Sequence, residues 1–310
     1  MAVRQRAALM LAAIGAASMT LAAQQRFKTG VDLVHFSVIV TDKQGSPITG
    51  LRQDEFELLE EGRPQSISYF TEGDPDDKPA EVMPLRLGLA LDTSGSMDRD
   101  IVDVRTGAIR FLRANEAAVD FTLVDFDTEV RVSRYGPDDT ERLIERIRRR
   151  RPDGWTALYD AVGVYLHSIG PEDGQKILLV YTDGGDTRSE LTYADLIDLL
   201  KSSDVTMYSI GYLENQSVSA RSTQQSQLQR MAAVTGGQAF FPTSLKELDK
   251  IYERIQREIA ARYSIGYLSS DTRKDGAWRR VEIKLKRPDL KGARLRARTG
   301  YFAPYKDGGH

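Results

Sequence analysis

The chain has 310 residues, of which 41% are hydrophobic and 28% charged, and its formal net charge is −2 at pH 7. This is the balance of a globular protein with a sizeable core, and the near-neutral charge gives no reason to expect nucleic acid or an anionic membrane as a partner. Because the chain has no cysteine, disulfides, thiolate metal sites and cysteine nucleophiles are excluded.

The first residues have the pattern of a secretory signal peptide. Arg4 and Arg6 precede an apolar and small-residue run over 7–23, and Thr20-Leu21-Ala22 places small residues where a signal peptidase requires them. We therefore expect residues 1–23 to be removed and the protein to be exported, either to the periplasm or out of the cell. The alternative is an uncleaved anchor, for which the run is short. No later segment is apolar enough to span a membrane.

Residues 28–72 have the pattern of short antiparallel strands. Three segments rich in β-branched and aromatic residues are separated by polar turns, and the expected strands are residues 31–40, 56–60 and 65–70. The charged, proline-containing stretch 73–83 then reads as a linker. A unit of about forty residues is small for an independent core.

The hydrophobic period changes in residues 84–261. Residues 85–91 are apolar or Gly apart from Arg86, as expected for a strand buried on both faces. Further strands are expected at 119–124, 130–132, 177–181, 205–210 and 237–241. Helices are expected at 101–112, 143–147, 157–169, 193–200, 228–233 and 245–261. This alternation predicts the α/β class, with a doubly wound, mostly parallel sheet covered by helices on both faces.

Residues 262–305 return to strand patterns, with expected strands at 263–268, 280–285 and 293–298. Neither β segment is large enough to fold alone, and the ends of an inserted domain usually lie close together. We therefore expect the segments 28–72 and 262–305 to pack into one small antiparallel β domain, interrupted by the α/β domain.

Polar side chains follow two of the expected buried strands. Asp92-Thr93-Ser94-Gly95-Ser96 comes directly after strand 85–91, and Asp183 follows strand 177–181. Ligand sites of parallel sheets lie beyond the carboxyl ends of the strands, so neighbouring strands would bring these carboxylates face to face. Thr156 adds a hydroxyl at a helix start. Hard oxygen donors suit Mg²⁺ or Ca²⁺ rather than zinc, and a site with few charges should accept a carboxylate from outside.

These residues resemble the metal-ion-dependent adhesion site of the von Willebrand factor A family, whose pattern is Asp-x-Ser-x-Ser followed by a distant Thr and a distant Asp. The corresponding positions are Asp92, Ser94, Ser96, Thr156 and Asp183. The resemblance spans residues 84–261 and includes Thr235-Gly236-Gly237 before a late strand. It implies that Mg²⁺, with Mn²⁺ and Ca²⁺ as alternatives, is bound by the hydroxyls directly and by the carboxylates directly or through water.

The flanking segments resemble an exported bacterial subgroup described as VWFA-related and best known from Acidobacteria. The residues that carry this resemblance are 38–43, 54–56 and 299–304. It covers the whole chain, but it implies no particular partner.

Catalytic interpretations fit less well. Asp92-Thr93-Ser94-Gly95 resembles the loop of an aspartic protease, but no second such loop follows an apolar strand. A subtilisin-like triad requires a histidine, and His35, His167 and His310 are each better placed for a structural or solvated role. The chain also has no Gly-rich nucleotide-binding motif.

Several residues near the expected site in the sequence allow either a functional or a structural interpretation. The four arginines at 148–151 could bind an anionic partner, although arginines that end a helix are more often solvated and favour the helix dipole. Trp155 could form the rim of a partner site or pack beneath the Thr156 loop. Four nearby carboxylates are expected to cap loops or lie outside the ligand shell: Asp98, Asp100, Asp160 and Asp186.

The sequence thus predicts a protein without enzymatic activity that binds a protein or peptide carboxylate through a divalent cation, as an adhesion or scaffold module. One alternative is a metal-independent structural or assembly role in the cell envelope. The other is a metal-assisted hydrolase, which would need a positioned base near the ion. The identity of the partner and the oligomeric state stay open.

Overall fold

The computed structural model describes residues 33–73, 84–170 and 174–305. The expected signal peptide, residues 28–32 of the first β segment, nearly all of the expected linker and His310 lie outside the described residues. In the part of the chain that is described, no helix is both long enough and apolar enough to cross a membrane.

A six-stranded sheet forms the centre of the chain, with the strand order β10-β9-β8-β5-β6-β7. All neighbours are parallel except β6 and β7, which form an antiparallel hairpin. The strands are β5 (Leu85–Asp92), β6 (Asp120–Phe126), β7 (Val130–Tyr135), β8 (Gln175–Thr182), β9 (Thr206–Gly211) and β10 (Ala239–Phe240). The fold is therefore mixed α/β with a mostly parallel sheet, which confirms the predicted class.

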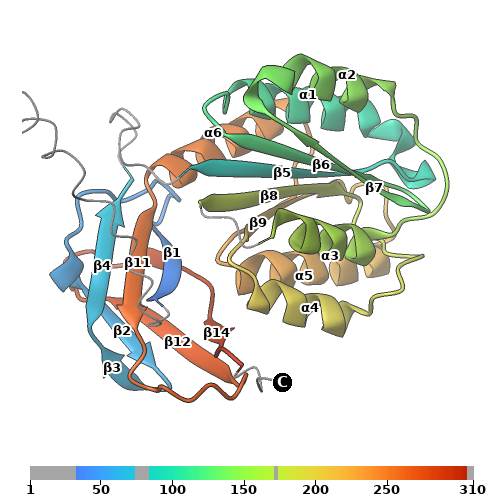
Figure 1. Cartoon of the computed structure of the whole chain (residues 1–310). Helices are drawn as coiled ribbons and strands as arrows, with labels where there is room; N and C mark the ends of the chain where they lie inside the picture. Colours follow the sequence, from blue (N-terminus) through green and yellow to red (C-terminus); the bar gives the residue numbers. More distant parts are fainter. Residues whose placement is uncertain (1–32, 74–83, 171–173, 306–310) are drawn as a thin grey trace, which may run out of the picture. The chain divides into compact units, whose positions relative to one another are not determined.

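Helices cover both faces of this sheet, as Figure 1 shows. One face carries α1 (Ile101–Arg113), α2 (Thr140–Arg149) and α6 (Leu245–Ala260), and the other carries α3 (Leu158–Ile169), α4 (Tyr193–Ser202) and α5 (Val218–Val234). Each face has its own apolar core. In β5, Leu89 and Leu91 pack into the first core and Ala90 into the second. This double burial explains why the strand is apolar or Gly on both faces from Leu87 to Leu91.

Two antiparallel four-stranded sheets enclose a third core, and their orders are β13-β1-β11-β4 and β14-β12-β2-β3. Their strands are β1 (Leu33–Thr41), β2 (Phe56–Glu60), β3 (Arg63–Gln65), β4 (Ile67–Glu72), β11 (Tyr263–Leu268), β12 (Trp278–Leu285), β13 (Arg294–Arg296) and β14 (Gly300–Phe302). β1 pairs with β11, and β2 pairs with β12. Each sheet thus combines strands from before and after the central α/β part. We call this unit the β domain.

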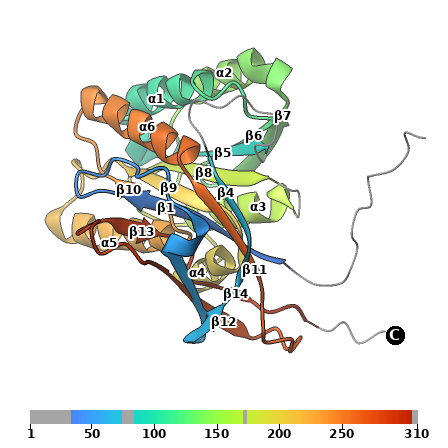
Figure 2. The ribbon, with the colours of Figure 1, turned by 90° about the vertical axis from the view of Figure 1, so that its left-hand side faces the viewer.

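A buried carboxylate also joins the two chain segments of the β domain. Glu60 in β2 accepts hydrogen bonds from the hydroxyls of Tyr267, Ser269 and Tyr301, at 2.5, 2.7 and 3.1 Å. The connection back from the α/β part is short, because α6 is followed after two residues by β11 (Figure 2). The last of these two residues, Arg262, is buried.

Several predicted elements have other bounds in the structure, and two of them differ for an identifiable reason. The single strand expected at 65–70 is divided, because the chain passes at Ser66 from β3 in one sheet to β4 in the other. The helix expected at 228–233 is the last part of α5, which begins at Val218. Its first half is polar and rich in Ser and Gln, so no apolar period marks it, while Ser217 caps it by accepting from the Ala220 amide.

Candidate functional site

The polar motifs of the sequence meet at the carboxyl ends of β5 and β8. These strands are neighbours in the sheet, with Leu91 opposite Tyr181. Asp92 is the last residue of β5, and Asp183 follows the last residue of β8 directly. The condition set by the sequence, that the two strands be neighbours, is met, and both carboxylates stand at the same edge.

Asp92 is a fully buried carboxylate. Its Oδ1 accepts from the Ser94 amide at 2.9 Å, and its Oδ2 accepts from the Thr182 hydroxyl at 2.6 Å. Burial raises the pKa of Asp92 to about 7, and the nearby charge of Asp183 acts in the same direction, while the two hydrogen bonds oppose it. No Lys or Arg of the described residues forms an ion pair with this carboxylate.

The two serines of the motif come together in the turn after β5. Ser94 precedes the short 3-10 helix η2 (Gly95–Arg99), and this turn places the Ser94 and Ser96 hydroxyls 3.2 Å apart. Ser94 is buried whereas Ser96 is exposed, so the pair extends from the sheet edge to the surface. Met97 anchors the turn in the first core.

The loop that carries Thr156 is bound to this turn through its backbone. The Gly95 amide donates to the Gly154 carbonyl at 3.1 Å, and the Asp153 amide donates to the Thr93 carbonyl at 2.9 Å. Gly154 has a φ of +73°, and a Cβ there would clash with Thr128, so this position requires glycine. The loop leads into α3, with Thr156 buried just before the helix begins.

Asp183 is held by a residue that the sequence reasoning did not identify. Its Oδ2 accepts from the Gln216 side-chain amide at 3.0 Å. Gln216 lies between β9 and α5, where no motif distinguishes it. Thr182, which orients Asp92, was also missed, although its place directly before Asp183 could have signalled it. Thr182 and Gln216 thus orient the two carboxylates, while the Thr156 loop is bound to the turn after β5 through its backbone.

The other nearby carboxylates hold loops in place. Asp160 accepts from the amides of Glu190 and Leu191, and Asp186 accepts from the Tyr159 amide. These bonds fix the chain after β8 against the start of α3. Asp100 accepts from Asn215 at 3.3 Å, and Asp98 is exposed.

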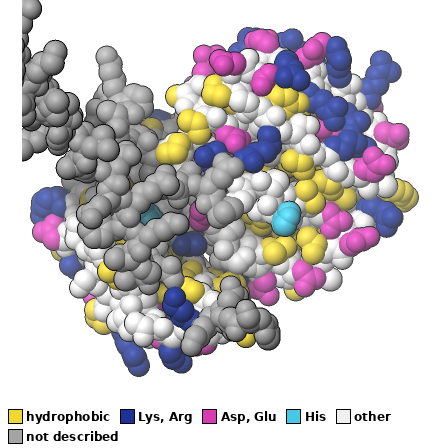
Figure 3. All heavy atoms as spheres, in the orientation of Figure 1, with side chains coloured by type: hydrophobic (Ala, Val, Ile, Leu, Met, Phe, Trp, Pro, Cys, Tyr) yellow, Lys and Arg dark blue, Asp and Glu magenta, His cyan; other side chains and the backbone are white. Residues whose placement is uncertain are grey.

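The arginines at the end of α2 are largely paired. Arg146 and Arg150 both bind Asp125, a buried carboxylate at the end of β6, and Arg149 pairs with Glu145. Figure 3 shows Lys and Arg side chains gathered on this side of the molecule, over α1 and α2. Of the predicted basic run, Arg150 thus belongs to an ion-pair network around β6, and Arg149 forms a pair along its own helix.

Trp155 is 65% exposed, next to the buried Thr156. This position favours the reading as a surface rim and not as packing beneath the loop. We predict that Trp155→Ala changes the free energy of unfolding by less than about 0.5 kcal/mol, as expected for an exposed side chain. Urea unfolding of both proteins measures this difference. A loss of about 2 kcal/mol or more would show that the ring packs against the loop.

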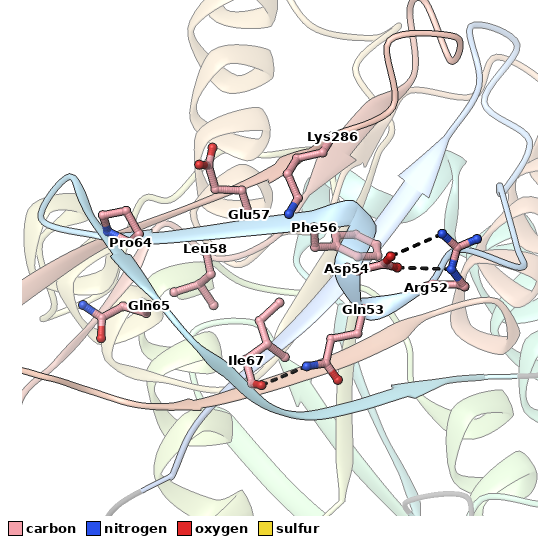
Figure 4. Close-up of a pocket in the computed structure, with 10 residues that line it drawn as sticks. All are labelled: Arg52, Gln53, Asp54, Phe56, Glu57, Leu58, Pro64, Gln65, Ile67 and Lys286. Carbon is pink, nitrogen blue, oxygen red and sulfur yellow. Dashed lines mark hydrogen bonds and ion pairs between the residues drawn. The ribbon is translucent and has the colours of Figure 1, made fainter.

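A pocket of about 490 Å³ lies in the β domain, away from this cluster. Figure 4 shows its lining, in which Arg52 pairs with Asp54 and the Gln53 amide donates to the Ile67 carbonyl. Its charges have both signs and partly neutralise each other.

Within the described ranges, no group of three or more His, Cys, Asp and Glu residues is arranged to hold a metal. A metal site within the described ranges would therefore have to include hydroxyl ligands from Ser or Thr.

Comparison with protein families gives one match. The sequence model of the family described as von Willebrand factor type A domain matches residues 87–254, which is more than half of the chain. No curated protein sequence matches the chain.

Solved structures with a similar fold share little sequence with the chain. The PilB minor pilin from Streptococcus sanguinis is 14% identical, with 73% of this chain and 87% of that chain covered and a TM-score of 0.48. The vWF domain of the type V pili tip protein Mfa5 from Porphyromonas gingivalis is 14% identical, with 57% and 96% covered and a TM-score of 0.47. A von Willebrand factor type A protein from Catenulispora acidiphila is 14% identical, with 91% and 76% covered and a TM-score of 0.47.

Proposed function

The chain belongs to the von Willebrand factor type A domain family, and from this membership and the site geometry we propose that it is a binding protein without enzymatic activity. Its site would hold a divalent cation, Mg²⁺ in the first place, to which an acidic group of a protein partner binds. The residues that would hold the ion are Asp92, Ser94, Ser96, Thr156 and Asp183. We propose in addition that the protein is exported, to the periplasm or out of the cell, because its first residues have the pattern of a signal peptide.

The observation that carries the proposal is the buried carboxylate of Asp92. Taking an ionised carboxylate out of water is costly unless a positive charge compensates it. Here two hydrogen bonds and no cationic side chain of the described residues compensate it, and Asp183 adds a second negative charge nearby. A divalent cation between the two carboxylates would supply the missing charge.

The other donors fit the same ion. The Ser94 and Ser96 hydroxyls lie 3.2 Å apart, a separation compatible with two oxygens on one small cation. Hydroxyl and carboxylate oxygens are hard donors, which Mg²⁺, Mn²⁺ and Ca²⁺ prefer. When bound, the ion would act as a Lewis acid that attracts a carboxylate oxygen. Because three of the five protein donors are neutral, the ion would keep enough positive charge to do so.

The surroundings favour a partner of macromolecular size. Ser96 is exposed and Trp155 projects beside the Thr156 loop, so the site opens onto the surface. An aromatic side chain next to a charged contact is a common anchor of protein interfaces. None of the cluster residues is a His or Glu placed as a general base, so the proposal is a binding function.

Thr156→Val tests whether the hydroxyl of this loop holds the ion. The substitution keeps the shape of a buried side chain and removes one oxygen donor, so we predict at least a tenfold loss in Mn²⁺ affinity, or about 1.4 kcal/mol. Electron paramagnetic resonance of free Mn²⁺ during a titration measures it. The matched control is Thr106→Val, whose hydroxyl donates within α1. Equal Mn²⁺ affinity of both variants would contradict the assignment of Thr156.

A further inference from the structure

A second polar site lies at the opposite end of the parallel strands, where β8 and β9 begin. A cavity of about 70 Å³ is enclosed there by residues of both the α/β part and the β domain. We call it the seam cavity. It is independent of the proposed metal site, which lies at the carboxyl ends of the strands. Its ionisable lining residues are His35, Lys176, Asp204, Arg262 and Arg298.

Arg262 is the most unusual of these residues. It is only 3% exposed, and its Nε and Nη2 atoms are shielded from solvent without a hydrogen-bond partner among the described residues. These two atoms form one edge of the guanidinium, which binds two oxygens of an anion at once. Elsewhere in the chain, the same edge of Arg273 binds Asp271 and that of Arg287 binds Asp289. The Tyr208 hydroxyl also reaches the Arg262 guanidinium, but no carboxylate of the described residues pairs with its Nε and Nη2 edge.

The other cations of the seam cavity are already engaged, and they leave an excess of positive charge. Lys176 is buried and pairs with Asp204, whose side chain is half exposed. Arg298 donates to the carbonyls of His35 and Ser203 and stacks on a phenyl ring, but no carboxylate pairs with it. Among the described residues, three cations and one carboxylate therefore line the cavity.

A second carboxylate among the described residues does not correct this excess. Glu258 of α6 is fully buried, and its charge reaches Arg262, but it pairs with Arg254 and with Arg296 of β13. Burial lowers the pKa of both Arg262 and Arg298, as expected for cations that lack sufficient counter-charge. A buried charge without a partner costs several kcal/mol, so an anion in the cavity would stabilise the protein.

We propose that the seam cavity binds one small oxyanion, held by two oxygens on the Nε and Nη2 edge of Arg262 and by the positive field of Lys176 and Arg298. A volume of about 70 Å³ exceeds the space needed for one water molecule several-fold, which is room for a carboxylate, sulfate or phosphate group. Because the lining comes from both the α/β part and the β domain, the anion would join the two.

The test is a calorimetric titration of metal-free protein with sulfate, phosphate, acetate and chloride in separate arms at constant ionic strength. EDTA is present throughout, so that the proposed metal site takes no part. We expect saturable binding with one site per chain for at least one oxyanion, at least tenfold tighter than chloride. The oxyanion that binds most tightly would show whether the cavity takes a sulfate, a phosphate or a carboxylate group. Chloride binding equally well, or no saturable binding in any arm, would overturn the proposal.

Variants distinguish this site from general salt effects. Arg262→Lys keeps the charge but removes the two-donor edge, and we expect it to weaken oxyanion binding at least tenfold. The matched control is Arg105→Met, because Arg105 also has Nε and Nη2 atoms without partners but lines a different pocket on α1. If Arg262→Lys does not fold, the same loss is expected in Arg298→Lys. Equal affinity in wild type and in the folded variant, or a loss in Arg105→Met instead, would refute the assignment.

Discussion

Mg²⁺ at 100 times its dissociation constant should raise the free energy of unfolding of the wild-type protein by about 2.7 kcal/mol, and Asp92→Asn should abolish this gain. The substitution keeps the size of the side chain and the acceptor for the Ser94 amide, but it removes the negative charge that the ion would neutralise. Urea unfolding of wild type and Asp92→Asn at pH 8, once with Mg²⁺ and once with EDTA, gives the four free energies of unfolding.

The metal-free state gives this experiment a second readout. Without an ion, the buried charge of Asp92 disfavours the folded protein, so the EDTA value of Asp92→Asn should equal or exceed that of wild type. Asp138→Asn, in an exposed turn before α2, is the control and should behave as wild type. An Mg²⁺ gain of the same size in Asp92→Asn would show that the ion binds elsewhere.

Gly237→Ala should lower the free energy of unfolding by about 3 kcal/mol, the upper part of the range for inserting a methyl group into a packed region. A Cβ at Gly237 would overlap the carbonyl oxygen of Met207 in β9. Backbone in a central strand cannot move aside easily, and Met207 is also fixed by its amide, which donates to the Thr235 hydroxyl at 2.9 Å. Urea unfolding in EDTA measures the loss without any contribution from a metal.

Gly136→Ala is the matched control for this substitution. Nothing lies within 4 Å of a Cβ at that position, and its φ of −77° suits any residue. Its stability should stay unchanged or rise by up to about 1 kcal/mol, because alanine restricts the unfolded chain. If both glycine variants lost the same stability, the tight contact between Gly237 and β9 would not be the cause.

The sequence predicts the α/β class well because burial of a strand on both faces requires a run of apolar residues, which is visible in the sequence. β5 is packed on both faces, so its residues from Leu87 to Leu91 are apolar or Gly, and a polar residue stands out where the strand ends at Asp92. The same change from apolar to polar residues marks the end of β8 before Asp183. The fold class and the place of each carboxylate at the end of a strand therefore followed from local patterns, whereas the adjacency of the two strands comes from the structure.

Features that depend on tertiary contacts were not predictable. Gln216 orients Asp183 from a loop without any motif, and Arg262 is buried where the chain passes from α6 to β11. Likewise, Ser66 separates two strands that belong to different sheets although residues 65–70 alternate like one strand. In each case the environment is built by residues far away in the sequence, so no local period reveals it.

Calorimetric titration of Mg²⁺ into metal-free wild-type protein tests the central claim most directly. The proposed site predicts saturable binding of one ion per chain, and Asp92→Ala should eliminate it. Heat without saturation, or a binding isotherm that the variant reproduces, would contradict a cation site formed by Asp92, Ser94, Ser96, Thr156 and Asp183.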